Sequence, residues 1–246
     1  AYMRTHPLNT ERIADMYNRA QHTPYKQIPD SLEFHLVRAK LRAQQGTPTE
    51  AEADFGNLLK EHKFVSEAAV HYGLARAELR AHNYAGADRD VQTLRRLKVA
   101  SPMVENLSAE IRSAQGDYAG AAAIYRSALK TFPFAKALIY GYADALLADR
   151  QNPQALAFIE AQQELYPQDY KLFGLQAKTA AALGRRLQQH RAQAEFYALQ
   201  GQTLPAIEQL QLAQRAGDGN FYEMSVVDAR LRELRARQTE EMKKRQ

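Results

Sequence analysis

The stretch GDYAGAAAIYRSALKTFP, residues 116–133, decides the fold. Its first three residues, Gly116 to Tyr118, end one helix and begin the next. Ala121 is small enough to let a neighbouring helix approach closely, and Tyr125 lies one turn further along on the same face. Pro133 ends the segment. This order of turn, small and aromatic residues predicts a helical hairpin.

The same features recur at a fixed spacing along the chain. Ala87, Ala121 and Ala155 are evenly spaced, and Pro133 and Pro167 repeat the same step. A period of about 34 residues resembles the tetratricopeptide repeat, a helix pair that buries its apolar face only by stacking on neighbouring pairs. The predicted fold class is therefore all-α, a tetratricopeptide-repeat α-solenoid.

Two departures from the strict period carry information. The step from Ala51 to Ala87 is longer than the period, so we expect the loop through Lys63 to be two residues longer than its counterparts. The step from Ala155 to Ala206 is one and a half repeats. This half-step predicts that the helix at 186–200 is the second helix of one pair and the first helix of the next.

Helix propensity and the repeat register predict about 12 helices in the solenoid. We expect a leading segment and linker from a preceding domain at 1–29, the solenoid with a capping helix at 30–237, and a frayed tail at 238–246. The predicted helices are Ser31–Gln45, Pro48–Glu61, Ser66–Ala81, Tyr84–Leu97, Pro102–Gln115, Tyr118–Thr131, Ala135–Ala148, Pro153–Leu165, Asp169–Leu183, Arg186–Gln200, Thr203–Ala216 and Phe221–Arg237.

Composition limits the classes of function. The chain contains no cysteine, which excludes disulfides and thiolate chemistry. No apolar run approaches the length of a transmembrane helix, so no membrane-spanning segment is expected. The net charge of +5 comes from 33 basic and 28 acidic residues. Basic residues cluster at 95–98, 185–191 and 230–245, and we interpret these clusters as solvated helix faces with interspersed glutamates. The basic C-terminal region has no aromatic residue after Tyr222 for base stacking, so nucleic acid is not an expected partner.

Residues 1–26 do not fit the repeat. They contain THPL at 5–8 and ERIA at 11–14, a turn followed by a helix that Asn9 or Thr10 caps. This string resembles the segment that follows the zinc site in a family of HExxH zinc metalloproteases. Some bacterial members continue from it into tetratricopeptide repeats, and the combination here is similar to periplasmic members with protease and chaperone functions.

The resemblance implies that this chain is the repeat region of a periplasmic zinc metalloendopeptidase in outer-membrane protein quality control. The implied partners are an upstream protease domain, the outer-membrane β-barrel assembly machinery and misfolded or unfolded outer-membrane proteins. Zinc is implied as a cofactor of the full-length protein only. The seven histidines of this chain form no HExxH motif, so no catalytic residue and no cofactor is expected within the chain itself.

His6 is the one residue for which the resemblance implies a metal contact. The family places this histidine on a loop near the zinc, where a neutral imidazole could occupy the open coordination position and hold the protease inactive. The alternative is a structural histidine that anchors the loop to the catalytic domain.

The concave face of the solenoid is the predicted protein-binding groove. In tetratricopeptide arrays the first helix of each pair lines that face, and tyrosines among mixed charges suit protein recognition. The groove interpretation expects Tyr72 and Tyr140 to be exposed, although single tyrosines at helical spacing are more often packing residues. We assign Tyr118, Tyr125 and Phe55 to the core. The positions that the family pattern selects for the groove are Lys40, Tyr72, Arg76, Asn106, Glu110, Tyr140 and Asp144.

Other functions remain open at this point. The first is a free-standing tetratricopeptide adaptor that binds a peptide or protein in its concave groove, and the second is a scaffold associated with the cell wall or with lipoproteins. Residues 1–26 discriminate between the protease and adaptor hypotheses. An adaptor would pack this segment as an ordinary first repeat helix, whereas the protease hypothesis predicts a segment that requires a neighbouring domain.

Overall fold

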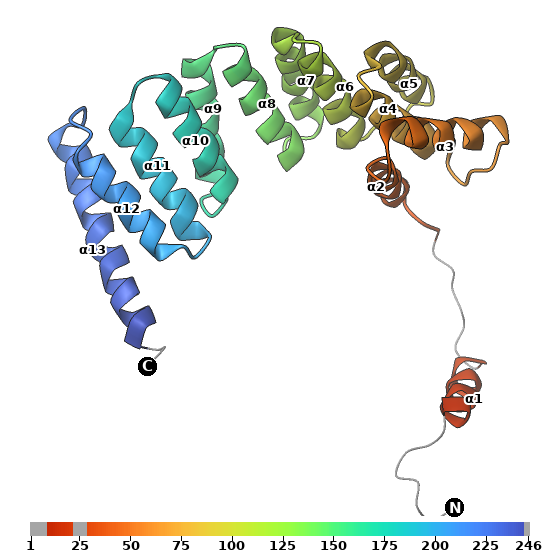
Figure 1. Cartoon of the computed structure of the whole chain (residues 1–246), viewed down its shortest axis with the longest axis horizontal. Helices are drawn as coiled ribbons and strands as arrows, with labels where there is room; N and C mark the ends of the chain where they lie inside the picture. Colours follow the sequence, from red (N-terminus) through yellow and green to blue (C-terminus); the bar gives the residue numbers. More distant parts are fainter. Residues whose placement is uncertain (1–8, 22–28, 244–246) are drawn as a thin grey trace, which may run out of the picture.

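The computed structural model describes residues 9–21 and 29–243, and all of its regular elements in these ranges are helices. Helix α1 stands apart, and α2 to α13 form an arch in chain order (Figure 1). The all-α solenoid prediction is confirmed. None of the helices in these ranges is long and apolar enough to cross a membrane. The bounds are α1 Asn9–Gln21, α2 Leu32–Arg42, α3 Pro48–Lys60, α4 Glu67–Arg80, α5 Tyr84–Arg96, α6 Pro102–Ala114, α7 Tyr118–Thr131, α8 Lys136–Ala148, α9 Asn152–Leu165, α10 Tyr170–Ala182, α11 Arg186–Leu199, α12 Thr203–Gln214 and α13 Phe221–Lys243.

One type of turn joins the two helices of each central pair. His82, Gly116, Arg150 and Gly184 have positive φ angles of 60°, 81°, 58° and 72°, and each lies one repeat period after the one before. After each of them, the next residue's amide donates to the carbonyl five residues back, as in Asp117 N to Arg112 O at 3.0 Å. This is the Schellman geometry, which satisfies carbonyls at the end of one helix and redirects the chain. The repeat is therefore a repeat of backbone conformation.

The half-step in the sequence is also caused by a left-handed turn of this type. Gly201 has a φ of 74° and follows Gly184 by half of the regular step. The Gln202 amide donates to Tyr197 O over 3.0 Å, which closes the same turn one helix later. As a result α11 packs against both α10 and α12. This arrangement agrees with the predicted double role of the helix at 186–200.

Small residues allow the helices to approach. Ala87, Ala121 and Ala155 are all fully buried, as their even spacing predicted. Between successive pairs, aromatic rings lie on glycines: a Cβ atom at Gly141 would overlap the ring of Tyr125. A Cβ atom at Gly73 would likewise overlap the ring of Phe55 on α3. Tyr125 and Phe55 therefore belong to the core, as predicted.

The prediction that Tyr118 belongs to the core is wrong, because its side chain is 38% exposed. It is the first residue of α7, directly after the turn at Gly116, and Asp117 caps the helix by accepting the Gly120 amide at 2.8 Å. The first residue of a helix has no preceding turn to pack against, so its side chain reaches the surface at the edge of the inner face.

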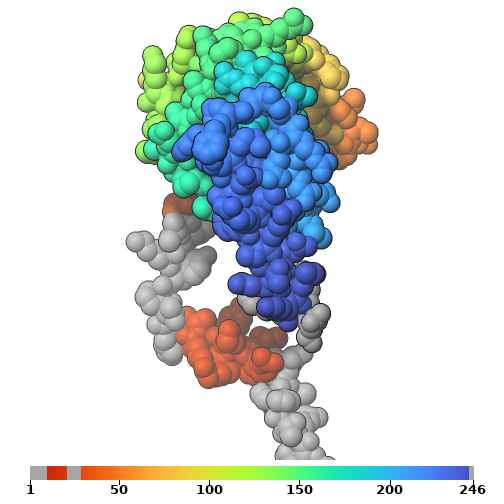
Figure 2. Space-filling model, turned by 90° about the vertical axis from the view of Figure 1, so that its left-hand side faces the viewer, coloured from red at the N-terminus to blue at the C-terminus, as the bar shows by residue number. Residues whose placement is uncertain are grey.

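The C-terminal boundary also differs from the prediction. Helix α13 runs to Lys243 and not to Arg237, so it includes most of the segment predicted to fray. Glu241 explains the extension, because it accepts hydrogen bonds from Arg237 Nε at 2.9 Å and from Thr203 Oγ1 at 3.1 Å. Arg230 adds a bidentate pair to Glu195 with both distances at 2.8 Å. Figure 2 shows α13 across the C-terminal end of the stack.

Helix α1 has an apolar face that no other helix covers. Ile13, Met16 and Tyr17 fall at helical spacing and are 60%, 68% and 69% exposed. All its side chains from Thr10 to Ala20 are exposed. Helix α1 itself does not pack as a first repeat helix, whereas the adaptor hypothesis requires that packing.

The turn geometry gives a prediction for Gly116. Gly116→Ala places a Cβ atom in the left-handed region, so we expect it to lower the free energy of unfolding by about 1 kcal/mol. No atom lies within 4 Å of that Cβ position, so the loss of stability would come from the unfavourable φ angle and not from a steric clash. Urea denaturation followed by circular dichroism measures the change.

Gly56→Ala is the matched control, because Gly56 lies within α3 and also has nothing within 4 Å of its Cβ position. There, alanine should stabilise the helix by up to about 1 kcal/mol. Changes of the same sign in the two variants would contradict the role assigned to the turn.

Candidate protein-binding groove

The inner face of the arch carries one charged residue per repeat at the same structural position. Arg76 on α4, Glu110 on α6, Asp144 on α8 and Lys178 on α10 follow one another in steps of one repeat period. We call these four residues the charge ladder. Its ends are basic and its two middle members are acidic, and the members pair along the solenoid.

The first pair of the charge ladder is partly buried. Arg76 Nη1 donates to Glu110 Oε2, and the two side chains are 15% and 34% exposed. Asn106 Nδ2 donates to the other carboxylate oxygen of Glu110 at 2.7 Å. Glu110 thus has a partner on α4 and a partner one turn away on α6, and its carboxylate is held in one orientation on the inner face.

The second pair is looser and faces solvent. Lys178 Nζ lies 3.9 Å from Asp144 Oδ1, with side chains 70% and 59% exposed. The groove wall partly desolvates the Asp144 carboxyl group and raises its pKa above the ordinary value, and Lys178 opposes this shift. Asp144 is therefore a carboxylate with capacity to accept further hydrogen bonds.

A cavity of about 520 Å³ lies between α6, α7 and α8. Lys40 reaches it from α2, and Glu110 and Asp144 border it. Burial raises the pKa of the Tyr125 hydroxyl, and the two carboxylates raise it further, so the phenol stays protonated as a donor. The residues that line the cavity are Lys40, Asn106, Glu110, Ser113, Tyr118, Tyr125, Ala137, Tyr140, Gly141, Asp144, Ala145 and Ala148.

Tyr140 is fixed by a second polar network at the edge of this cavity. Its hydroxyl donates to Asp169 Oδ2 at 2.6 Å, and Lys136 Nζ contacts the same oxygen at 2.6 Å. Burial acts to raise the pKa of Asp169, but these two donors outweigh it and hold the pKa below its ordinary value. Lys171 lies 5.3 Å above the Tyr140 ring. Tyr140 thus presents a rigid, half-buried ring to the groove.

The cavity brings together five of the seven predicted groove residues, and the other two lie deeper. Tyr72 is 1% exposed, so the expectation of an exposed tyrosine there is wrong and its alternative assignment as a packing residue is right. Burial raises the pKa of Tyr72 to about 12. Arg76 does not line the cavity itself and contacts it through Glu110. Whether these residues bind a protein stays a prediction.

Sequence reasoning missed two groove residues. Lys178 is one repeat beyond Asp144, and one further step of the same period would have found it. Tyr118 was assigned to the core together with Tyr125 and Phe55, but it is 38% exposed whereas Tyr125 is buried. A tyrosine at the first position of a helix is a signal for exposure, and that signal was available in the sequence.

The predicted metal contact at His6 lies outside the described residues and stays a prediction. Within 9–21 and 29–243, no group of three or more His, Asp and Glu side chains is placed to hold a metal ion.

The charge ladder predicts that removing the charge at Arg76 and at Lys178, its two ends, changes the free energy of unfolding by unequal amounts. Arg76→Met leaves Glu110 partly buried without its main partner, so we expect a loss of about 1–3 kcal/mol in the free energy of unfolding. Lys178→Met removes an exposed pair and should change that free energy by less than about 0.5 kcal/mol. Urea denaturation of the two variants gives both values, and a loss from Lys178→Met as large as that from Arg76→Met would refute this assignment.

Comparison with known proteins agrees with the repeat fold. A tetratricopeptide repeat profile matches residues 113–179. The beta-barrel assembly-enhancing protease of Escherichia coli K12 is 27% identical over 234 residues, which cover 94% of this chain and 47% of that protein. The protease of the same name from Yersinia pestis is 26% identical over 232 residues, with 94% and 48% covered. The chain thus spans about half the length of these curated relatives.

Solved structures give the fold alone. MamA 41-end from Desulfovibrio magneticus RS-1 superposes with a TM-score of 0.51 at 18% identity, over 71% of this chain and 99% of that one. A MamA RS-1 double mutant gives the same TM-score and identity, with 71% and 98% covered. The fold is a tetratricopeptide-like α-solenoid, and the chain is similar to about half of the length of the beta-barrel assembly-enhancing proteases.

Proposed function

We propose that this chain is the polypeptide-binding repeat region of a periplasmic zinc metalloprotease that acts in the assembly and quality control of outer-membrane β-barrel proteins. The similarity over 94% of the chain to proteases named for β-barrel assembly supports this proposal. The zinc and the catalytic residues would belong to another domain of the full-length protein, because the described residues here provide no metal-binding group.

The observation that carries the proposal is the cavity between α6, α7 and α8. Tyr118 and Tyr140 offer aromatic surface there, and Glu110 and Asp144 offer carboxylate acceptors. An unfolded β-barrel protein presents extended segments whose side chains alternate between apolar and polar. Its backbone N–H groups could donate to the two carboxylates while its apolar side chains contact the tyrosines. This complementarity does not depend on one exact sequence, as a quality-control protein requires.

Helix α1 supports the link to a protease domain. Its apolar face, formed by Ile13, Met16 and Tyr17, is exposed, and burial of that face requires a partner. We propose that the preceding catalytic domain covers it. A contact between His6 and the zinc of that domain, which would hold the protease inactive, is part of the same proposal. Docking on the β-barrel assembly machinery would use the arch of repeats, whose extended surface suits large partners.

The groove is tested with a fluorescently labelled outer-membrane β-barrel protein, diluted from urea into the 246-residue chain. Tyr118→Ala removes aromatic surface from the cavity. Tyr140→Ala does the same, and it also removes a hydrogen bond to Asp169. Because a tyrosine at the centre of a binding site contributes about 1–2 kcal/mol, we expect each variant to weaken binding roughly 5- to 30-fold.

Tyr222→Ala is the matched control, because Tyr222 is 75% exposed on α13 and lies outside the cavity. It should bind the unfolded protein as the unaltered chain does. Circular dichroism at the assay temperature checks that all three variants keep their helix content. Equal affinity for the Tyr118→Ala, Tyr140→Ala and Tyr222→Ala variants would reject the groove as the binding site.

A further inference from the structure

The first helix pair is built differently from the others. In the pairs that follow, the two helices of the pair pack on each other, whereas α2 and α3 both pack on α4 and are splayed apart. Residues 61–66 connect α3 to α4, whereas residues 132–135 suffice between α7 and α8. Residues 62–66 of this longer connection line a gap between α2 and α4.

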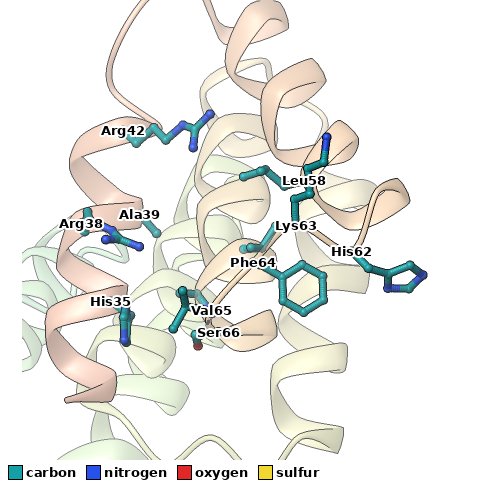
Figure 3. Close-up of a pocket in the computed structure, with 12 residues that line it drawn as sticks. His35, Arg38, Ala39, Arg42, Leu58, His62, Lys63, Phe64, Val65 and Ser66 are labelled. Carbon is teal, nitrogen blue, oxygen red and sulfur yellow. Dashed lines mark hydrogen bonds between the residues drawn. The ribbon is translucent and has the colours of Figure 1, made fainter. Parts of the chain in front are cut away.

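A pocket of about 470 Å³ occupies this gap. Figure 3 shows Arg38 and His35 on α2 facing Lys63, Val65 and Ser66 across it. It shares no lining residue with the cavity of the groove. Its floor is apolar and includes Ala39, Leu58 and Val70, whereas the charged residues that line it are all basic.

The basic residues differ in how far they are already paired. Arg42 contacts Asp54 at 3.3 Å, and Lys63 contacts Glu61 at 2.7 Å. Arg38 is exposed, lies 5.8 Å from the Phe34 ring, and has no carboxylate partner among the described residues. The pocket therefore keeps one guanidinium group available for an anionic ligand.

Two further features of this pocket favour an anion: Ser66 and His35 both line it. Helix α4 begins there, with Ser66 as its N-cap, and the N-terminal amides of a helix favour an anion. Glu67 is the acidic residue in the first turn of α4, and its carboxylate lies 3.9 Å from His71. His35 is only 8% exposed, and its Nδ1 atom is buried without a hydrogen-bond partner. A buried nitrogen without a partner is uncommon in proteins and is costly, so an acceptor that reached this ring would relieve the cost.

We infer that this pocket, which we call the α2–α4 pocket, binds an acidic segment of a partner polypeptide, with a carboxylate between Arg38, His35 and the start of α4. The apolar floor would take the aliphatic side chain next to that carboxylate. Arginine suits this role because its planar donors match a carboxylate. The site is separate from the proposed groove and does not depend on it.

The probe is a short fluorescein-labelled peptide of alternating leucine and glutamate, and fluorescence anisotropy measures its binding to the 246-residue chain. We expect saturable binding that weakens about tenfold or more in Arg38→Glu, because a charge-assisted hydrogen bond is lost and a repulsion replaces it. His35→Phe keeps the ring and removes the nitrogens, so it should weaken binding several-fold. Arg38→Met, without an introduced repulsion, should also weaken binding.

Arg126→Glu is the charge-matched control, because Arg126 is exposed on α7 and lines neither pocket. It changes only nonspecific attraction and should leave the affinity within about twofold. A peptide of leucine and glutamine lacks the carboxylates and should bind weakly. Tyr118→Ala should bind the probe normally, which separates this site from the groove. An equal loss in Arg38→Glu and Arg126→Glu, equal affinity for the glutamine peptide, or no saturable binding would each overturn the inference.

Discussion

The left-handed turn between the helices of a pair is the constraint on which this structure depends. Its positive φ angle recurs at residues 82, 116, 150 and 184, and each turn is closed by an amide that donates five residues back. Glycine occupies only two of these four positions, so His82 and Arg150 adopt a conformation that residues with a Cβ atom disfavour. The arch follows because each turn sends the chain back at the same angle.

A repeated backbone also repeats the direction of each side chain. This is why Arg76, Glu110, Asp144 and Lys178, each one repeat apart, form a single ladder along the inner face. The acidic middle of that ladder coincides with a cavity rich in tyrosine. The groove is therefore a consequence of the period, and its chemistry depends on which residues occupy one position of the repeat.

The sequence predicted what the period controls. It located the helices, the buried alanines and the double role of α11, because these depend on local turn chemistry and on spacing. Prediction from the sequence failed where a residue in one repeat has a different environment from the residues at the same position of the other repeats. Tyr72 is buried although Tyr140, at the same position of the repeat, reaches the groove, because burial is set by the neighbouring helices. The splaying of α2 and α3 and the length of α13 depend on contacts between distant residues and could not be read from a local pattern.

The most direct test of the central claim is hydrogen exchange of the chain with and without an unfolded outer-membrane β-barrel protein. Binding in the groove predicts added protection of backbone amides in α6, at the start of α7 and in α8, where the cavity lies. Helices α5 and α9 do not line that cavity and should exchange as before. Protection confined to those outer helices, or no added protection at a concentration where binding is complete, would contradict the account.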